Sequence, residues 1–153
     1  MATLIGAAKA MLEETKDELA KALSFVPEDK RAWRPVETAT SALDIVVECA
    51  FTLNMGAKLL RGEVVTMDGP TPTGADYSTA DAACAYLEAT HSEIQAAIDG
   101  IDESRLDEVV RLPWGSQMPL SRVLMLFAGH NAYHAGQLSY IQRLLGDTGY
   151  HFE

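Results

Sequence analysis

The chain has 153 residues, a length that predicts a single domain over residues 1–153. Hydrophobic residues make up 48% and charged residues 22%, an ordinary globular composition that excludes disordered and fibrous classes. The 22 acidic residues against 12 basic ones give a formal net charge of −10. This charge argues against nucleic-acid binding, because that function needs clustered Lys and Arg.

Two features of the sequence favour a cytoplasmic location. The only cysteines, Cys49 and Cys84, form neither a CxxC motif nor a disulfide framework, as expected in a reducing compartment. The N-terminal segment has no basic start, and Glu13 and Glu14 interrupt its apolar stretch. It therefore predicts neither a signal peptide nor a membrane span, and we expect no membrane partner.

The first half of the chain predicts two amphipathic helices, because apolar residues recur there at helical spacing. The first helix is expected over residues 5–25. A loop with two prolines follows, in which Trp33 is expected to pack back onto the helices. Ser41 is placed to cap a second helix over residues 42–61, and Gly62 is placed to end it.

A turn-rich segment separates the second helix from the third. Residues 63–77 contain two prolines and two glycines, which predict an irregular and functional loop. Ser78 followed by Asp81 resembles a capping box at the start of a third helix, expected over residues 79–99 and closed by Gly100.

The last third of the sequence predicts a short hairpin and a fourth helix. Residues 108–118 contain the turn formers Pro113 and Gly115, which indicates a small β-hairpin that turns near them. Pro119 is placed at the start of a helix that continues to residue 145. Four amphipathic helices in one domain predict an all-α fold, a four-helix bundle with two longer connections.

The candidate chemistry lies on the fourth helix. His130 and His134 are four residues apart, so their side chains lie one turn apart on the same face. Phe127 and Leu138 lie on that face too, which indicates that it points into the bundle. Buried imidazoles need partners, and either a divalent metal or hydrogen bonds to a carboxylate or backbone carbonyls would provide them.

Glu48 is an unusual carboxylate on the apolar face of the second helix. Together with His130 and His134 it would give a metal two nitrogen ligands and one oxygen ligand, with a position left open for water or substrate. Cys49 is excluded from this set, because a neighbouring residue points about 100° away around the helix. Common nucleotide-binding and serine-hydrolase motifs are absent from the sequence.

The sequence resembles the DinB/YfiT-like family of four-helix-bundle proteins over nearly its whole length. The resemblance rests on His130-xxx-His134-x-Gly136-Gln137, the segment from Ser41 to Glu48, the loop containing Trp33, and Leu144-Leu145-Gly146. It implies a metal site with three histidines, two of which correspond to His130 and His134. The third corresponds to Glu48, so the site is expected either to bind metal through a carboxylate or to be degenerate.

The resemblance implies a divalent metal cofactor, with zinc or nickel first and iron or manganese as alternatives. His91 is considered as a fourth ligand or only a hydrogen-bonded histidine, and Asp44 as a partner of the site or only a helix-start acid. Gln137 is considered as a donor toward bound water. No separate catalytic acid or base can be identified.

The expected function is that of a metal-dependent enzyme, either a hydrolase or a transferase that uses a low-molecular-weight thiol. Its partners would be a small-molecule substrate or thiol and a second copy of the chain in a homodimer. The resemblance also implies a bacterial, stress-related protein. The alternatives are a metal- or ligand-binding protein without turnover and a bundle with a degenerate site.

Overall fold

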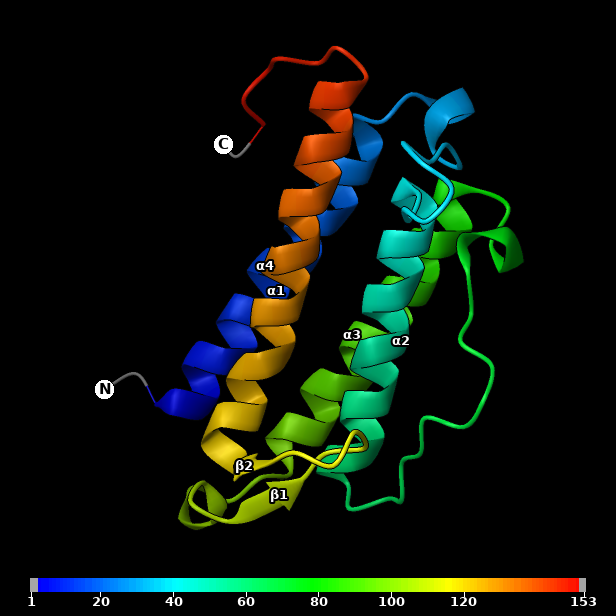
Figure 1. The fold of residues 1–153 in the computed structure, drawn as a ribbon. Helices are drawn as coiled ribbons and strands as arrows, with labels where there is room; N and C mark the ends of the chain where they lie inside the picture. The colour runs from blue at the N-terminus through cyan, green and yellow to red at the C-terminus, as the bar shows by residue number, and fades with distance from the viewer. Residues whose placement is uncertain (1–2, 152–153) are drawn as a thin grey trace.

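Four long helices dominate the computed structural model, which describes residues 3–151; the first two and last two residues of the predicted domain lie outside it. The helices are α1 (Leu4–Ser24), α2 (Ala42–Leu60), α3 (Ala80–Asp99) and α4 (Leu120–Leu144). In Figure 1, α1 and α4 run in one direction, and α2 and α3 run in the other. The predicted all-α four-helix bundle is confirmed.

The helix ends follow from capping chemistry. The Ser41 hydroxyl accepts a hydrogen bond from the Asp44 backbone N–H at 3.2 Å, and the Asp44 carboxylate accepts one from the Ser41 N–H at 3.0 Å. Gly62 ends α2 with a φ of 80°. The predicted cap of α3 at Ser78 is wrong by one residue, because Thr79 has the extended backbone and its hydroxyl accepts the capping bond.

A small hairpin lies at the end of the bundle where α3 ends and α4 begins, as Figure 1 shows. Strands β1 (Val109–Arg111) and β2 (Gln117–Pro119) pair antiparallel, with Val110 opposite Met118. Gly115 in the turn has a φ of 91°, a conformation that glycine adopts without strain. The predicted hairpin is confirmed.

Two glycines allow close packing around α2. A Cβ at Gly56 would lie 2.5 Å from the ring of Phe127, so only glycine lets this part of α2 approach α4 so closely. A Cβ at Gly74 would lie 2.7 Å from Leu43. The Gly74 N–H donates to Asp44 at 2.9 Å, which holds the long connection between α2 and α3 against the start of α2.

Three smaller expectations concern Trp33, the two cysteines and the absence of a membrane span. Trp33 packs against the core, as predicted. Cys49 is buried, Cys84 is partly buried, and neither forms a disulfide. Within residues 3–151, none of the helices combines the length and the apolar composition needed to cross a bilayer.

Candidate metal centre

The two histidines of α4 point across to α2, where Glu48 meets them. The Nε2 atoms of His130 and His134 lie 3.2 Å apart. The Glu48 Oε1 atom lies 3.5 Å from Nε2 of His134 and 4.0 Å from Nε2 of His130. The structure thus brings the three predicted ligands together, and their binding of a metal stays a prediction.

Gln137 sets the orientation of the His134 ring. Its Oε1 lies 2.7 Å from His134 Nδ1, and an amide oxygen can only accept, so Nδ1 carries the proton and donates. The Gln137 amide nitrogen in turn donates to the Tyr133 hydroxyl at 3.2 Å. The lone pair of His134 Nε2 therefore faces His130 and Glu48, which is the arrangement that metal-binding histidines use. Sequence reasoning considered Gln137 only as a donor toward water and missed this role.

His130 is a neutral imidazole without enough partners. Burial lowers its pKa to about 4, with a further contribution from the charge of His134 and against the attraction of Glu48. Its Nδ1 atom is buried and has no hydrogen-bond partner within residues 3–151. Leaving such a group unsatisfied costs about 1–3 kcal/mol, and an ion bound at the opposite ring atom, Nε2, would not remove this cost.

Glu48 lies at the rim of this cluster and is less buried than the sequence analysis expected. Its side chain is 42% exposed, against 7% for His134. The contact with His134 lowers the pKa of Glu48, burial opposes this effect, and attraction to both imidazoles adds to it. A carboxylate oxygen beside two imidazole nitrogens suits a divalent cation chemically. The short distances from Glu48 to both imidazole nitrogens and its negative charge support Glu48 as a ligand. Its partly exposed side chain does not.

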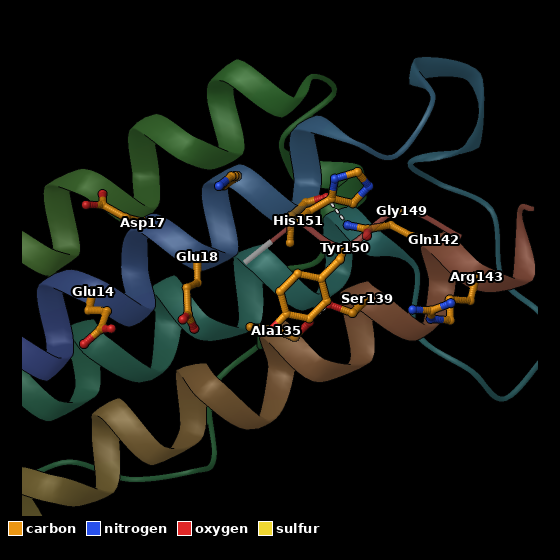
Figure 2. Close-up of a pocket in the computed structure, with 12 residues that line it drawn as sticks. Glu14, Asp17, Glu18, Ala135, Ser139, Gln142, Arg143, Gly149, Tyr150 and His151 are labelled. Carbon is orange, nitrogen blue, oxygen red and sulfur yellow. Dashed lines mark hydrogen bonds between the residues drawn. The ribbon is translucent and has the colours of Figure 1, made fainter. Parts of the chain in front are cut away.

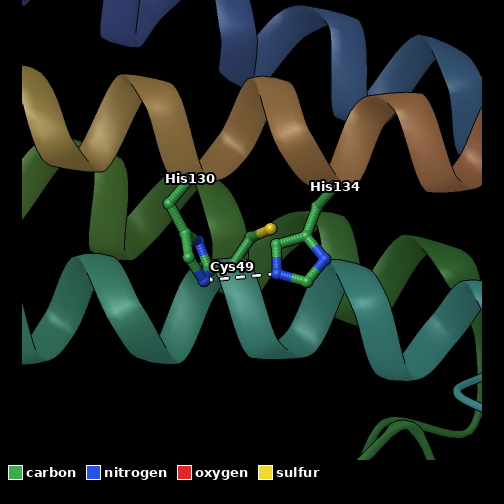
Figure 3. A group of neighbouring side chains, drawn as sticks. All are labelled: Cys49, His130 and His134. Carbon is green, nitrogen blue, oxygen red and sulfur yellow. Dashed lines mark hydrogen bonds between the residues drawn. The ribbon is translucent and has the colours of Figure 1, made fainter.

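Cys49 lies closer to the histidines than the sequence analysis allowed. Its sulfur is within 4.8 Å of ligand atoms of both His130 and His134. Figure 3 shows its side chain reaching toward the two rings from the neighbouring helix. A rotation of about 100° around α2 therefore does not keep Cys49 away from the rings of His130 and His134. Burial raises the pKa of the Cys49 thiol, and the charge of Glu48 raises it further, so a metal would have to displace its proton.

His91 and Asp44 have other partners. His91 Nε2 lies 2.8 Å from Glu13 on α1, so this ring nitrogen is bonded away from His130 and His134. The Asp44 carboxylate caps α2 and also accepts hydrogen bonds from Gly74 and Arg34, both at 2.9 Å. Both residues thus follow the simpler of their two predicted roles.

An apolar cavity of about 310 Å³ borders the cluster. Glu48 and His130 form its polar wall. Its apolar lining includes Met55, Leu59, Met67, Leu112, Trp114 and Phe127. The contributions of the hairpin and of the α2–α3 connection were missed by sequence reasoning. The signal available for them was a large apolar residue, Trp114, in a turn rich in proline and glycine.

A more polar cleft of about 410 Å³ lies on the other side of Glu48. Its polar lining includes Arg34, Thr38, Thr40, Asp44, Thr71 and Thr73. The cleft and the apolar cavity share Glu48, Thr52, Met55 and Met67. The candidate metal centre therefore lies at the boundary between a polar and an apolar space.

A third cavity, of about 350 Å³, lies between α1, α4 and the C-terminal segment, as Figure 2 shows. Acidic side chains of α1 and Arg143 of α4 line it. Its one histidine, His151, binds Asp147 at 2.8 Å and stacks on Phe25 with ring centroids 3.7 Å apart. Neither His130 nor His134 lines this cavity, so it is separate from the candidate centre.

The fold and the cluster together define a four-helix-bundle protein with a candidate metal centre between α2 and α4. The sequence profile of the DinB superfamily matches residues 11–138, and the chain belongs to this superfamily. The family resemblance predicted from the sequence is thereby confirmed. Among curated proteins, no sequence matches the chain.

Solved structures with low sequence identity share the fold. A conserved protein of Enterococcus faecalis is 15% identical, with a TM-score of 0.73 over 92% of this chain and 96% of that one. A DinB-like protein of Bacillus subtilis is 15% identical, with a TM-score of 0.67 over 94% of each chain. A mycothiol-dependent maleylpyruvate isomerase is 16% identical, with a TM-score of 0.69 over 90% of this chain and 63% of its own.

Proposed function

We propose that this chain is a divalent-metal-dependent enzyme in which Glu48, His130 and His134 hold one ion. The observation that supports this most directly is the convergence of two imidazole Nε2 atoms, 3.2 Å apart, on one carboxylate oxygen. Two nitrogen ligands and one oxygen ligand suit zinc or nickel, and also iron or manganese. Three protein ligands would leave a coordination position open toward the two spaces that border Glu48.

Such an ion would lower the pKa of a coordinated water or thiol and so supply a nucleophile near neutral pH. The chain's own part is to hold the ligands, and Gln137 does this for His134 by fixing its ring and tautomer. The cleft and the apolar cavity offer separate places for a polar and an apolar reactant on either side of Glu48.

We favour a transferase that uses a low-molecular-weight thiol over a hydrolase. Apart from the three ligands, the titratable residues that line the two spaces are Arg34 and Asp44, which bind each other. Hydrolysis usually needs a free acid or base to move protons, whereas a bound thiolate attacks without one. The similar fold of an isomerase described as mycothiol-dependent is consistent with this choice.

Elemental analysis of untagged protein tests the metal site. Wild-type protein should contain stoichiometric metal, and Glu48→Ala and His134→Ala should lose it. His151→Ala is the matched control, because it removes a histidine–carboxylate pair outside the centre. Equal metal content in all four proteins would contradict the proposal.

Cobalt substitution distinguishes the two possible third ligands. With Glu48 as ligand, the cobalt protein should lack a near-ultraviolet charge-transfer band from thiolate to metal, and Cys49→Ala should bind cobalt as wild type does. A strong band that disappears in Cys49→Ala would replace Glu48 by Cys49 in the ligand set.

A turnover screen separates the enzyme classes. The metal-loaded protein should consume small thiols together with electrophilic substrates, and His134→Ala should not. Hydrolysis of esters or amides without any thiol would favour the hydrolase. Stoichiometric metal with no turnover in either screen would favour a metal- or ligand-binding protein.

A further inference from the structure

The cavity beside the candidate centre has a consistent apolar character along two helices. On α2 it follows one stripe, from Glu48 through Met55 to Leu59. On α4 it follows His130 to Phe127, one turn earlier. Both stripes run from the candidate ligands toward the hairpin end of the bundle, so one end of the cavity is polar and the rest is apolar.

The mouth of this cavity exposes large apolar side chains. Trp114 in the hairpin turn and Met67 in the α2–α3 connection are each 54% exposed. Leu112 and Phe127, deeper in the wall, are 2% and 4% exposed. Exposed aromatic and thioether side chains around a concave apolar space are typical of a ligand site, because a ligand would cover them. The volume, about 310 Å³, lies at the lower end of the usual range for small-molecule pockets.

From this arrangement we infer that the substrate joins a metal-binding polar group to an uncharged apolar chain or ring, and that the apolar part occupies the cavity formed by Met55, Leu59, Trp114 and Phe127. The inference rests on the proposed function, since the polar group would bind the ion held by Glu48 and His130. Charged groups line the cavity only at its metal end, so a charged tail would lose its hydration without gaining a partner.

Hydroxamates test the inference, because their head group binds zinc and their tail can be varied. The zinc-loaded protein is titrated calorimetrically with acetohydroxamate, with hexanohydroxamate, and with a hydroxamate whose tail has the same length but contains ether oxygens. Burial of the added methylenes should make hexanohydroxamate bind about tenfold or more tightly than acetohydroxamate. The hydroxamate with the ether tail should bind only slightly more tightly than acetohydroxamate.

Two variants test whether the apolar tail occupies the cavity. Trp114→Ala removes an exposed wall residue and should reduce the advantage of hexanohydroxamate by about three- to tenfold, with the affinity for acetohydroxamate unchanged. Val64→Ala is the matched control, because Val64 is an exposed apolar residue of the α2–α3 connection that does not line this cavity. The Val64→Ala variant should keep the full affinity advantage of hexanohydroxamate over acetohydroxamate.

The outcomes separate this inference from the proposed function. Normal binding of acetohydroxamate with no gain from the apolar tail would overturn the inference and leave the metal site intact. A gain that Trp114→Ala and Val64→Ala affect equally would also overturn it. Failure of the zinc-loaded protein to bind any hydroxamate would overturn both, because no open metal position would then exist.

Discussion

The bundle contains two clusters of histidine and carboxylate side chains that differ in how their charges are balanced. In the α1–α3 cluster, His91 donates to Glu13 at 2.8 Å, and the Lys16 ammonium lies 2.9 Å from Glu13 and 2.9 Å from Glu88. In the α2–α4 cluster, Glu48 pairs only with His130 and His134 within residues 3–151. The first cluster contains its own cation, and the second does not.

The difference shows what distinguishes a structural cluster from a candidate metal centre. Bonding to Lys16, and secondly to His91, lowers the pKa of Glu13, so that carboxylate is ionised and paired. Glu48 is held ionised as well, but by two rings of which one, His130, is neutral. A divalent cation would supply the missing positive charge and bind both facing nitrogens at once.

The largest expected effect is the stabilisation of the folded protein by metal. This stabilisation should depend on the α2–α4 cluster and not on the α1–α3 cluster. Zinc at about 100 times its dissociation constant should raise the free energy of unfolding by about 2.7 kcal/mol, because it binds the folded state alone. Urea denaturation with zinc and with a chelator measures this. His134→Ala should abolish the difference, and His91→Asn should keep it. An unchanged wild-type curve would contradict the proposed site.

Removal of His91 should act on stability and leave metal binding unchanged. Its side chain is 3% exposed and bonded to Glu13, so His91→Ala leaves a cavity and removes one of the two partners of Glu13, the other being Lys16. We expect a loss of about 2 kcal/mol in the chelator-treated protein. Denaturation and elemental analysis check the two parts. Loss of metal in this variant would mean that the clusters are coupled.

Gln137 provides a smaller test of the second cluster. Gln137→Leu removes the acceptor for His134 Nδ1 and should weaken zinc binding by about tenfold, since partners that orient ligands typically contribute about 10- to 100-fold. Competition with a zinc-binding dye measures the affinity. Gln137→Glu keeps an acceptor and should bind zinc at least as tightly as wild type. Equal weakening in both variants would argue against an orienting role.

Much of this fold could be predicted from the sequence, because its signals are local. Helical periodicity and caps such as Ser41 with Gly62 defined α2 closely, and a turn around Gly115 defined the hairpin. The error at Ser78 arose because two adjacent hydroxyl residues offer the same capping chemistry. The close approach at Gly56 could not be predicted, since it depends on a ring from another helix.

The candidate site could be predicted only in part. Spacing identified His130 and His134, and resemblance together with an anomalous charge identified Glu48. The exposure of Glu48, the approach of Cys49 and the cavity wall at Trp114 depend on how α4 and the hairpin pack against α2, which local spacing does not specify. The Gln137 contact was accessible from its spacing of three residues from His134.

Asp44 lies one turn before Glu48 on α2, and its replacement is expected to give the smallest effect on stability. Burial alone would raise its pKa, but hydrogen bonds from Ser41 and Gly74 and attraction to Arg34 outweigh it, so the pKa is lowered. A lowered pKa in the folded state means that the ionised form stabilises the fold above the unfolded value, about 3.9, and that this stabilisation disappears as the pH falls through the folded value.

Asp44→Asn should therefore destabilise the protein by about 1 kcal/mol at neutral pH, the usual contribution of a helix cap. The difference from wild type should shrink as the pH falls below about 4, because wild-type Asp44 is then protonated too. Urea denaturation at several pH values measures this. Glu48→Gln, compared with wild type in the presence of a chelator, should cost less stability, since the contacts of Glu48 within residues 3–151 are with imidazole nitrogens and not with backbone donors. A difference for Asp44→Asn that stayed constant with pH would show that its charge does not contribute.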